Sequence, residues 1–437
     1  MATYTVFFPN GKYPQSYSPA IAGLDYNPMF GELVDLSTAT VVTRTSTKMD
    51  LKLDNGLRLR FSGTDFGFDS EGNPIGGKVA RIELFQSDGT TLVSKIEGLS
   101  LSLEALDNAA HTFDPWNLQA WIMKGNDRLN GSAGNDDLEG FAGNDIINGG
   151  GGDDFVIGGE GKDSYDGGAG WDNLSFQDAR YNSNARAGIR LDAAAGTVTD
   201  PYGNAETFQN FETFRGTQFR DVMKGSARDE DFQGIGGRDV IDGRGGFDTV
   251  SYHRDQSNSG GKVGVTVNLQ AGTAVDGFGK TDTLTSIEGV RGTAFADKLT
   301  GSSGSNWLRG DAGNDKIAGG LGNDLLRGDS GKDCFVFNTK LSASNNVDEI
   351  DDFNVAADTI WLENAIFTKL TGTGVLSAAQ FCANNSGMAG DASDRIIYEK
   401  DAGNLYYDSN GSASGGRVIF ATLDAGLAMT AADFFII

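Results

Sequence analysis

The sequence has little of several features that define common classes of protein. It contains two cysteines, Cys334 and Cys382, so it is no scaffold of many disulfides; we expect two buried thiols, with one disulfide between them as the alternative. Seven prolines in 437 residues exclude a proline-rich linker, and the glycines lack the period of three that collagen requires. No hydrophobic run approaches the ~18 residues of a membrane-spanning helix, so no transmembrane segment is expected.

Basic residues are also scarce. Lys and Arg number 35 against 60 Asp and Glu, which leaves a formal charge of −25. Because nucleic-acid binding depends on Lys and Arg that neutralise phosphates, this balance argues against nucleic acid and favours cations as partners. The first residues show no basic segment followed by an apolar stretch, so no Sec-type signal peptide is predicted. The protein is then either cytosolic or exported by a route that needs no N-terminal signal.

Glycine, in contrast, is abundant, and a repeat of nine residues accounts for much of it. From Ile122 to Ser175, six consecutive units follow the pattern G-G-x-G-x-D-x-U-x, where U is a large apolar residue. The fourth place holds Gly125, Gly134, Gly143, Gly152, Gly161 and Gly170. The sixth place holds Asp127, Asp136, Asp145, Asp154, Asp163 and Asp172. The eighth place holds Leu129, Leu138, Ile147, Val156, Tyr165 and Leu174.

The pattern returns in two later blocks. Residues 216–251 hold four units, one of them with Glu230 at the sixth place, and residues 292–336 hold five, one of them with Asn306 there. The other sixth-place residues are Asp221, Asp239, Asp248, Asp297, Asp315, Asp324 and Asp333. The two intervening segments are duplicates at an offset of 76 residues, since Phe211-Glu-Thr-Phe-Arg-Gly-Thr217 matches Ile287-Glu-Gly-Val-Arg-Gly-Thr293. Their alternating apolar residues (Val263, Val265, Val267 and Leu269) predict enlarged rungs of one solenoid.

Each unit predicts one very short strand and one turn. The strand turns its eighth-place side chain inward, and the glycine-rich remainder can adopt positive φ without a Cβ clash. One unit alone buries almost nothing, so the units must stack to build a core. Two units complete one coil, which places each turn on the turn two units later. We therefore predict an all-β fold, a parallel β-roll (β-solenoid) with a thin apolar interior.

Stacking brings sixth-place aspartates close together, where their charges repel unless a cation lies between them. Carboxylates and turn carbonyls are hard oxygen ligands that suit Ca²⁺, with its 6–8 ligands, better than the strict octahedron of Mg²⁺. Zinc favours His or Cys, and the chain has only His111, His253 and the two cysteines. Isolated Asp-Gly turns are usually solvated turn formers. Because so many units keep one register, we predict calcium instead.

These units resemble the nonapeptides of the RTX, or haemolysin-type calcium-binding, secreted proteins of Gram-negative bacteria. Gly131-Ser-Ala-Gly-Asn-Asp136 and Gly319-Gly-Leu-Gly-Asn-Asp324 are close matches to the family's turn. The resemblance implies that each ion lies between turns two units apart, held by both aspartates and by carbonyls of the glycine turns. The implied aspartate ligands are Asp127, Asp136, Asp145, Asp154, Asp163, Asp172, Asp239, Asp248, Asp315, Asp324 and Asp333. The implied glycines are Gly125, Gly134, Gly140, Gly143, Gly149, Gly152, Gly158, Gly167, Gly304, Gly313, Gly319 and Gly328.

Some units depart from the pattern. The turns before Asp221 and Asp297 lack the glycines, so these two are doubtful ligands, and Glu230 and Asn306 weaken their pairs. The blocks together predict about six to nine calcium ions. Without calcium, charge repulsion and glycine entropy oppose folding, so we expect a roll that is disordered in chelator and folds at the ~10⁻⁴–10⁻³ M calcium used by extracellular modules.

The resemblance further implies export by the type I secretion machinery. The chain ends Asp433-Phe-Phe-Ile-Ile437, which is similar to the acidic-then-apolar terminus of type I substrates. We therefore expect an extracellular or cell-surface protein, secreted without an N-terminal signal peptide.

The residues outside the repeats predict two further β domains. Alternating apolar residues on either side of Asp54-Asn-Gly56 predict a hairpin, with strands near 79–85 and 94–103 and a short helix over 102–110. Apolar runs at 395–398, 404–407 and 417–420 predict a cap over the end of the roll. The expected divisions are an N-terminal domain (1–121), repeat blocks (122–175, 216–251 and 292–337), inserted rungs (176–215 and 252–291) and a C-terminal β cap with the secretion signal (338–437).

No catalytic motif stands out. The sequence has neither H-E-x-x-H nor G-x-S-x-G, and Asp65, Asp69 and Glu71 lie in a turn-rich stretch typical of solvated loop acids. We expect a protein that acts without catalysis, by adhesion or as a scaffold, on a polysaccharide or a cell-surface component. The alternative is an exported polysaccharide-modifying or -degrading enzyme with its carboxylates in residues 1–121.

Overall fold

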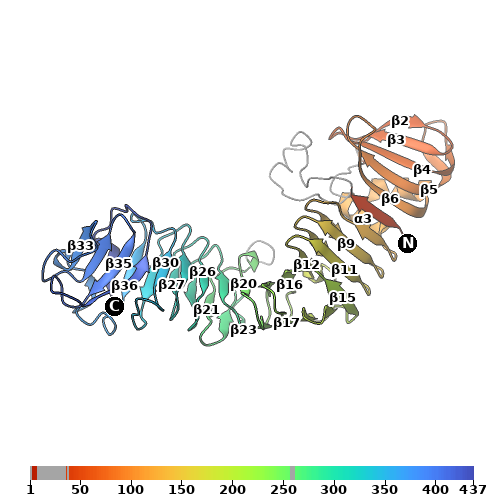
Figure 1. Cartoon of the computed structure of the whole chain (residues 1–437). Helices are drawn as coiled ribbons and strands as arrows, with labels where there is room; N and C mark the ends of the chain where they lie inside the picture. Colours follow the sequence, from red (N-terminus) through yellow and green to blue (C-terminus); the bar gives the residue numbers. More distant parts are fainter. Residues whose placement is uncertain (1, 7–35, 37–38, 256–260) are drawn as a thin grey trace. The chain divides into compact units, whose positions relative to one another are not determined.

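The computed structural model describes residues 2–6, 36, 39–255 and 261–437 and divides into two compact units, Met1–Thr217 and Gln218–Ile437. It is mostly β, with two short α-helices among the described residues (Figure 1). No helix in this described part is long and apolar enough to cross a membrane. Cys334 and Cys382 are both free thiols, as expected, although each is half-buried rather than buried. The alternative of a disulfide between them is wrong.

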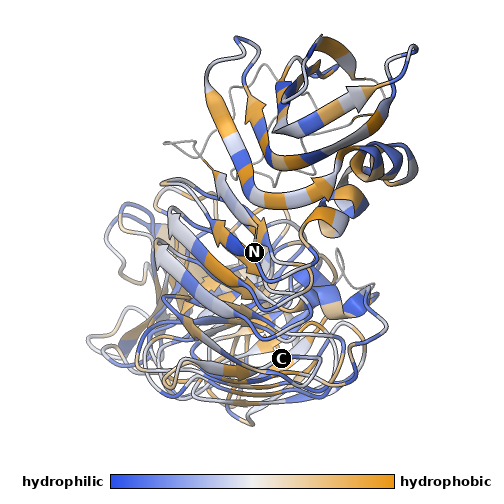
Figure 2. Ribbon diagram, turned by 90° about the vertical axis from the view of Figure 1, so that its right-hand side faces the viewer, coloured by the Kyte–Doolittle hydropathy of each residue, from blue (hydrophilic) through white to orange (hydrophobic). Residues whose placement is uncertain are grey.

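An antiparallel sheet forms the N-terminal domain. Its strands are β1 (Thr3–Val6), β2 (Thr40–Arg44), β3 (Lys48–Lys52), β4 (Arg58–Phe68), β5 (Pro74–Phe85) and β6 (Leu92–Ser102). The predicted Asn-Gly hairpin is confirmed as β3–β4, with Leu51 opposite Leu59. Hydrophobic and hydrophilic residues alternate along these strands (Figure 2), and the inward set, which includes Leu59, Ile82 and Ile96, is buried. Strand β1 also pairs in parallel with the first strand of the repeats, so the sheet continues into the roll.

Two helices follow β6, α2 (Leu103–Thr112) and α3 (Pro115–Ile122). Ser102 caps α2 by accepting a hydrogen bond from the amide of Ala105, and Asp114 caps α3 by accepting from Asn117. The predicted short helix is thus confirmed, whereas α3 lies in a stretch for which no helix was predicted.

The first repeat block forms two parallel sheets on opposite sides of a thin core. One contains β7 (Arg128–Asn130), β9 (Ile146–Gly151) and β11 (Ser164–Ala169), and the other contains β8 (Asp137–Glu139), β10 (Phe155–Ile157) and β12 (Asn173–Ser175). Partners in each sheet lie two units apart, as the period predicts: Leu129 pairs with Ile147, and Leu138 with Val156. Every eighth-place residue of the block is buried. The predicted β-roll is confirmed.

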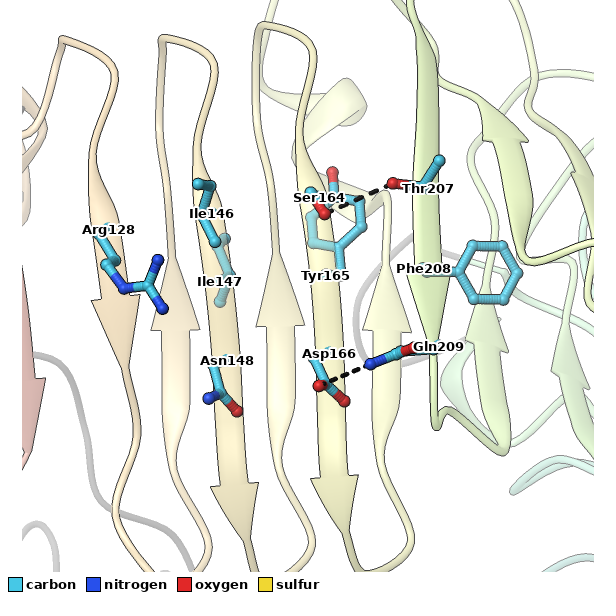
Figure 3. A pocket seen from close by; sticks show the side chains of 10 residues that line it. All are labelled: Arg128, Ile146, Ile147, Asn148, Ser164, Tyr165, Asp166, Thr207, Phe208 and Gln209. Atoms are coloured by element: carbon cyan, nitrogen blue, oxygen red, sulfur yellow. Dashed lines mark hydrogen bonds between the residues drawn. The ribbon is translucent and has the colours of Figure 1, made fainter.

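The first inserted segment contains the 3₁₀ helix η1 (Gln177–Arg180) and the strands β13 (Arg190–Asp192), β14 (Thr197–Thr199), β15 (Ala205–Gln209) and β16 (Thr213–Arg215). Strands β15 and β16 continue the two parallel sheets by pairing with β11 and β12. Figure 3 shows this join: Thr207 Oγ1 donates to Ser164 Oγ at 3.4 Å, and Gln209 Nε2 to Asp166 Oδ2 at 2.8 Å. Strand β14, however, runs antiparallel between β13 and β15, so the insert is more than an enlarged rung.

The second unit begins with the short repeat block, β17 (Val222–Lys224) and β19 (Val240–Asp242) in one sheet and β18 (Asp231–Gln233) and β20 (Thr249–Ser251) in the other. The second insert repeats the antiparallel arrangement with β21 (Thr266–Asn268), β22 (Thr273–Val275) and β23 (Thr281–Thr285). Strand β23 pairs with β19 and β21 pairs with the next block, so the insert adds strands inside a continuous sheet. Val265 and Val267 face the core as predicted, whereas Val263 is 54% exposed and Leu269 is half-buried.

The third block and the cap complete this unit. One sheet contains β24 (Gly289–Arg291), β26 (Trp307–Arg309) and β28 (Leu325–Arg327). The opposite sheet contains β25 (Lys298–Thr300), β27 (Lys316–Ala318) and β29 (Cys334–Phe337). The cap contains β30 (Asp348–Ile350), β31 (Thr359–Leu362), β32 (Gly374–Val375), β33 (Phe381–Asn384), β34 (Ile396–Glu399), β35 (Asn404–Asp408), β36 (Arg417–Thr422), β37 (Phe434–Ile436), and the 3₁₀ helices η2 (Ala378–Gln380) and η3 (Ala431–Asp433). Strands β30 and β31 stack in parallel on β28 and β29, and β36 and β37 stack on them in turn. Phe337, Phe367, Tyr407 and Phe420 pack edge to face inside the cap.

An ion-pair ladder runs along one edge of the third block. Arg291, Arg309 and Arg327 occupy the same place in successive coils, and Asp311 and Asp329 alternate with them. The Nε atom of Arg309 lies 2.9 Å from Asp311 and 2.5 Å from Asp329. This ladder contributes to stacking without using any sixth-place carboxylate.

Candidate metal sites

The sixth-place carboxylates form ladders along both sides of the roll. Within each block, one oxygen of a sixth-place carboxylate accepts a hydrogen bond from the backbone amide of the sixth-place residue 18 positions earlier. The first aspartates of two blocks accept from other amides, Asp127 from Ala2 and Asp297 from Val265. The amide of Asp127 donates to Asp145 Oδ1 at 2.7 Å, and that of Asp136 to Asp154 Oδ1 at 2.8 Å. The same bond links Asp221 to Asp239, Asp297 to Asp315, and Asp315 to Asp333. The register inferred from the period therefore places these carboxylates on adjoining turns.

The second oxygen of many of these carboxylates is buried without a hydrogen-bond partner. This holds for Oδ2 of Asp127, Asp145, Asp154, Asp172, Asp248, Asp315, Asp324 and Asp333. None of these residues is more than 2% exposed. A buried acceptor without a partner is costly, and a row of them at equivalent places calls for a common ligand.

A carbonyl oxygen converges on the same point beside the first glycine of the turn. A Cβ placed ideally on Gly140 would lie 2.5 Å from Asp145 Oδ2 and 2.6 Å from the carbonyl oxygen of Gly158, which belongs to the turn two units later. Gly149 has the same two neighbours in Asp154 Oδ2 and the carbonyl of Gly167. Only glycine leaves this volume free, and a Ca²⁺ ion needs oxygens at about 2.3–2.6 Å. The residues present therefore fit calcium.

Burial raises the pKa of these groups. Desolvation is the main cause that raises the pKa of Asp145 and of Asp154 to about 8, and the charges of the stacked aspartates add to it. The pKa of Asp315 rises to about 7 for the same reasons. A divalent cation between the turns would offset both the desolvation and the repulsion.

In four turns whose second residue is Ser or Thr, the backbone amide of that residue holds the sixth-place side chain. The amide of Ser132 donates to Asp136 Oδ2 at 2.5 Å, and the amide of Ser226 donates to both carboxylate oxygens of Glu230. The amides of Thr293 and Ser302 donate in the same way to Asp297 Oδ2 and Asn306 Oδ1. Asp136 thus differs from Asp145, Asp154 and Asp172 of its block, and the hydroxyl residue at the second place is the sequence signal for this difference.

The ladders end on acids that the nonapeptide pattern does not contain. Asp163 and Asp172 donate from their amides to Glu206 and Glu212 of the first insert, at 3.2 and 3.1 Å. At the corresponding places of the second unit, Asp239 and Asp248 donate to Asp282 and Glu288. Asp348 and Asp358 of the cap receive the amides of Asp324 and Asp333. The offset of 76 residues between the two inserts aligns Glu206 with Asp282 and Glu212 with Glu288. This duplication is the sequence signal that could have identified these acids.

Other candidate residues lie apart from these ladders. His111 is exposed on α2, with Nδ1 at 2.8 Å from the carbonyl oxygen of Asp107. Asp69 accepts the amides of Glu71 and Asn73 in an exposed turn, and these bonds lower its pKa. Within the described ranges, no three His, Cys, Asp or Glu side chains gather as one metal cluster. Main-chain carbonyls must therefore supply much of any coordination in the roll.

A family model for the RTX calcium-binding nonapeptide repeat matches the chain in four copies, at residues 123–156, 139–174, 215–250 and 291–333. The chain carries RTX calcium-binding nonapeptide repeats. The matched ranges cover the three blocks in which the RTX aspartates form ladders.

No curated protein matches the chain. Among solved structures, the extracellular lipase LipA from Serratia marcescens is 19% identical over 71% of this chain and 40% of the lipase, with a TM-score of 0.18. The chain thus spans less than half of the lipase's length, and a likeness at this TM-score supports no conclusion about activity.

Proposed function

We propose that this calcium-binding RTX protein is secreted, that its roll folds when it meets extracellular Ca²⁺, and that it acts without catalysis as an adhesive or scaffolding component. The observation that carries this proposal is the row of buried Oδ2 atoms without partners, all but that of Asp127 beside a first-place glycine. At Gly140, Gly149, Gly167, Gly243 and Gly310, a carbonyl oxygen of a neighbouring turn lies beside the same volume. Such sites suit a structural ion that joins one turn to another.

The charge of the chain couples calcium binding to folding. With a formal charge of −25 and a thin core, the calcium-free roll must bury carboxylates whose protonated form is favoured at neutral pH. Calcium removes this cost only in the folded state, so its binding free energy becomes folding free energy. RTX sites in the ~10⁻⁴–10⁻³ M range of extracellular modules would remain unfilled in the cytosol and fill outside the cell.

Far-UV circular dichroism of the full chain during a calcium titration tests this coupling. We expect β signal to increase cooperatively as calcium reaches the millimolar range, and an equal concentration of Mg²⁺ to have little effect. A spectrum that is the same in chelator and in calcium would contradict the proposal.

Export is tested separately. Deleting residues 380–437 should retain the protein in the producing cells if the type I machinery reads this end. In the structure, Phe434–Ile436 form β37, which pairs in parallel with β31. Substitutions that unpair β37 without shortening the chain therefore control for loss of the cap. Secretion of the deleted chain would remove the support for this route.

The enzyme alternative needs two carboxylates flanking a glycan. A hollow of the N-terminal domain is lined by Met49, Phe61, Asp107 and His111 among others, and Asp107 is the one carboxylate among the described residues that line it. Incubation with acidic and neutral bacterial polysaccharides should therefore release no shortened chains. Reproducible cleavage that is lost on substituting Asp107 would favour an enzyme.

A further inference from the structure

The last turn of each of the first two blocks lacks a nonapeptide partner two units later, yet the geometry around it is unchanged. At Gly167, the ideal Cβ position lies 2.6 Å from Asp172 Oδ2 and in close contact with the carbonyl oxygen of Asn210. Asp172 is completely buried, and its Oδ2 has no partner. The carbonyl of Gly167 lies beside Gly149 in the same way. Asn210, in the first insert, therefore supplies the carbonyl that a further nonapeptide would supply to Gly167.

The second insert repeats this arrangement. The ideal Cβ position on Gly243 is in close contact with Asp248 Oδ2 and with the carbonyl oxygen of Ser286. Asp248 is also completely buried, with an Oδ2 that has no partner. Ser286 and Asn210 both have positive φ, 50° and 58°, so each presents its carbonyl from a left-handed turn residue.

Glutamate replaces aspartate because these turns are shorter. Glu212 follows Asn210 by two residues, whereas Asp172 follows Gly167 by five. The extra methylene of glutamate lets Glu212 Oε2 reach the amide of Asp172 at 3.1 Å, and Glu288 Oε2 reaches that of Asp248 at 3.0 Å. Both glutamates lie 40 residues after their aspartate, where a nonapeptide partner would lie 18 residues after it.

On the opposite side of the same coil, a tyrosine side chain fills the position where a cation would bind. Tyr165 takes an eighth-place position, and its hydroxyl donates to Glu206 Oε2 at 2.9 Å and contacts Asp163 Oδ2 at 3.3 Å. The same hydroxyl fills the volume beside Gly158 that faces Asp163 Oδ2. A phenol therefore occupies the place of a cation between Asp163 and Glu206.

We propose that the duplicated inserts complete two calcium sites of their own, one from Asp172, Glu212 and the Asn210 carbonyl, and one from Asp248, Glu288 and the Ser286 carbonyl. The position between Asp163 and Glu206 holds no ion. This inference rests on the proposed calcium function and assigns ligands outside the nonapeptides. Each insert thereby adds one calcium site after the last nonapeptide of a block.

Native mass spectrometry of the full chain at saturating calcium counts the ions. Glu212→Gln and Glu288→Gln should each lower the count by one, and the double variant by two. Glutamine keeps an oxygen that accepts the aspartate amide, so the turn is preserved while the charge is lost. Glu206→Gln is the matched control and should leave the count unchanged.

Terbium luminescence provides a second measurement on the first site. Trp171 precedes Asp172 and donates from Nε1 to Thr213 Oγ1 at 2.8 Å, which holds the indole beside the site. Tb³⁺ alone, added to wild type and excited through tryptophan, should give emission that Glu212→Gln reduces and Glu206→Gln does not.

The outcomes distinguish failure of the insert sites from failure of the proposed calcium function. An unchanged ion count in both Glu→Gln variants, with wild type binding calcium, overturns the insert sites alone. Loss of an ion in Glu206→Gln overturns the assignment of the phenol. A wild type that binds no calcium overturns the proposed function itself.

Discussion

A methyl group added to one glycine should remove one calcium ion without changing any charge. Gly140→Ala places Cβ 2.5 Å from Asp145 Oδ2 and 2.6 Å from the carbonyl oxygen of Gly158, which is the volume a cation would take. Gly140 does not have positive φ, so alanine brings no backbone strain of that kind. Gly125→Ala is the matched control, because a Cβ there meets nothing within 4 Å and φ is again not positive.

The magnitude follows from ligand linkage. A site with a Kd of ~10⁻⁴–10⁻³ M stabilises the folded state by about 1.4–2.7 kcal/mol at about 10 mM calcium. For a unit such as Met1–Thr217, losing that contribution lowers the unfolding temperature by about 3–11 °C. Scanning calorimetry in calcium, with an ion count by native mass spectrometry, measures both effects. Equal shifts for Gly140→Ala and Gly125→Ala, or an unchanged ion count for Gly140→Ala, would refute the placement of the ion.

Further predictions concern individual carboxylates, pH and the ion-pair ladder. Asp154→Asn should lose bound calcium in equilibrium dialysis, whereas Asp136→Asn should lose little because a serine amide already holds that side chain; equal losses would contradict this distinction. Burial raises the pKa of Asp145 from 3.8 to about 8, so between these values the calcium-free folded roll binds more protons than the unfolded chain. The stability of the calcium-free roll is therefore greatest below a pH of 3.8 and is lost as the pH rises through the pKa of about 8 of the folded state. Circular dichroism in chelator should show more β structure at about pH 5 than at about pH 8. Arg309→Ala should cost about 0.5–1 kcal/mol at low salt and less at high salt, and a loss independent of salt would show that packing matters more than charge.

The sequence alone determined the repeating part of the molecule. A period of nine residues acts locally: it places one apolar side chain in the core, one aspartate beside each turn and glycine where the backbone needs room. Leu129, Ile147 and Val156 are buried, and Asp145 lies beside Asp127, because both follow from a spacing of two units. The β-roll and its calcium chemistry could be predicted for that reason.

Only the tertiary structure decided which oxygens have partners. Glu206 and Glu212 reach the ladders from 43 and 40 residues away, across an antiparallel insert whose path no local period describes. A serine amide satisfies Asp136 and a phenol satisfies Asp163, although both aspartates look regular in the sequence. Coordination depends on the convergence of atoms from different turns. That convergence is a property of the folded chain, and the repeat pattern specifies it only while the repeats continue.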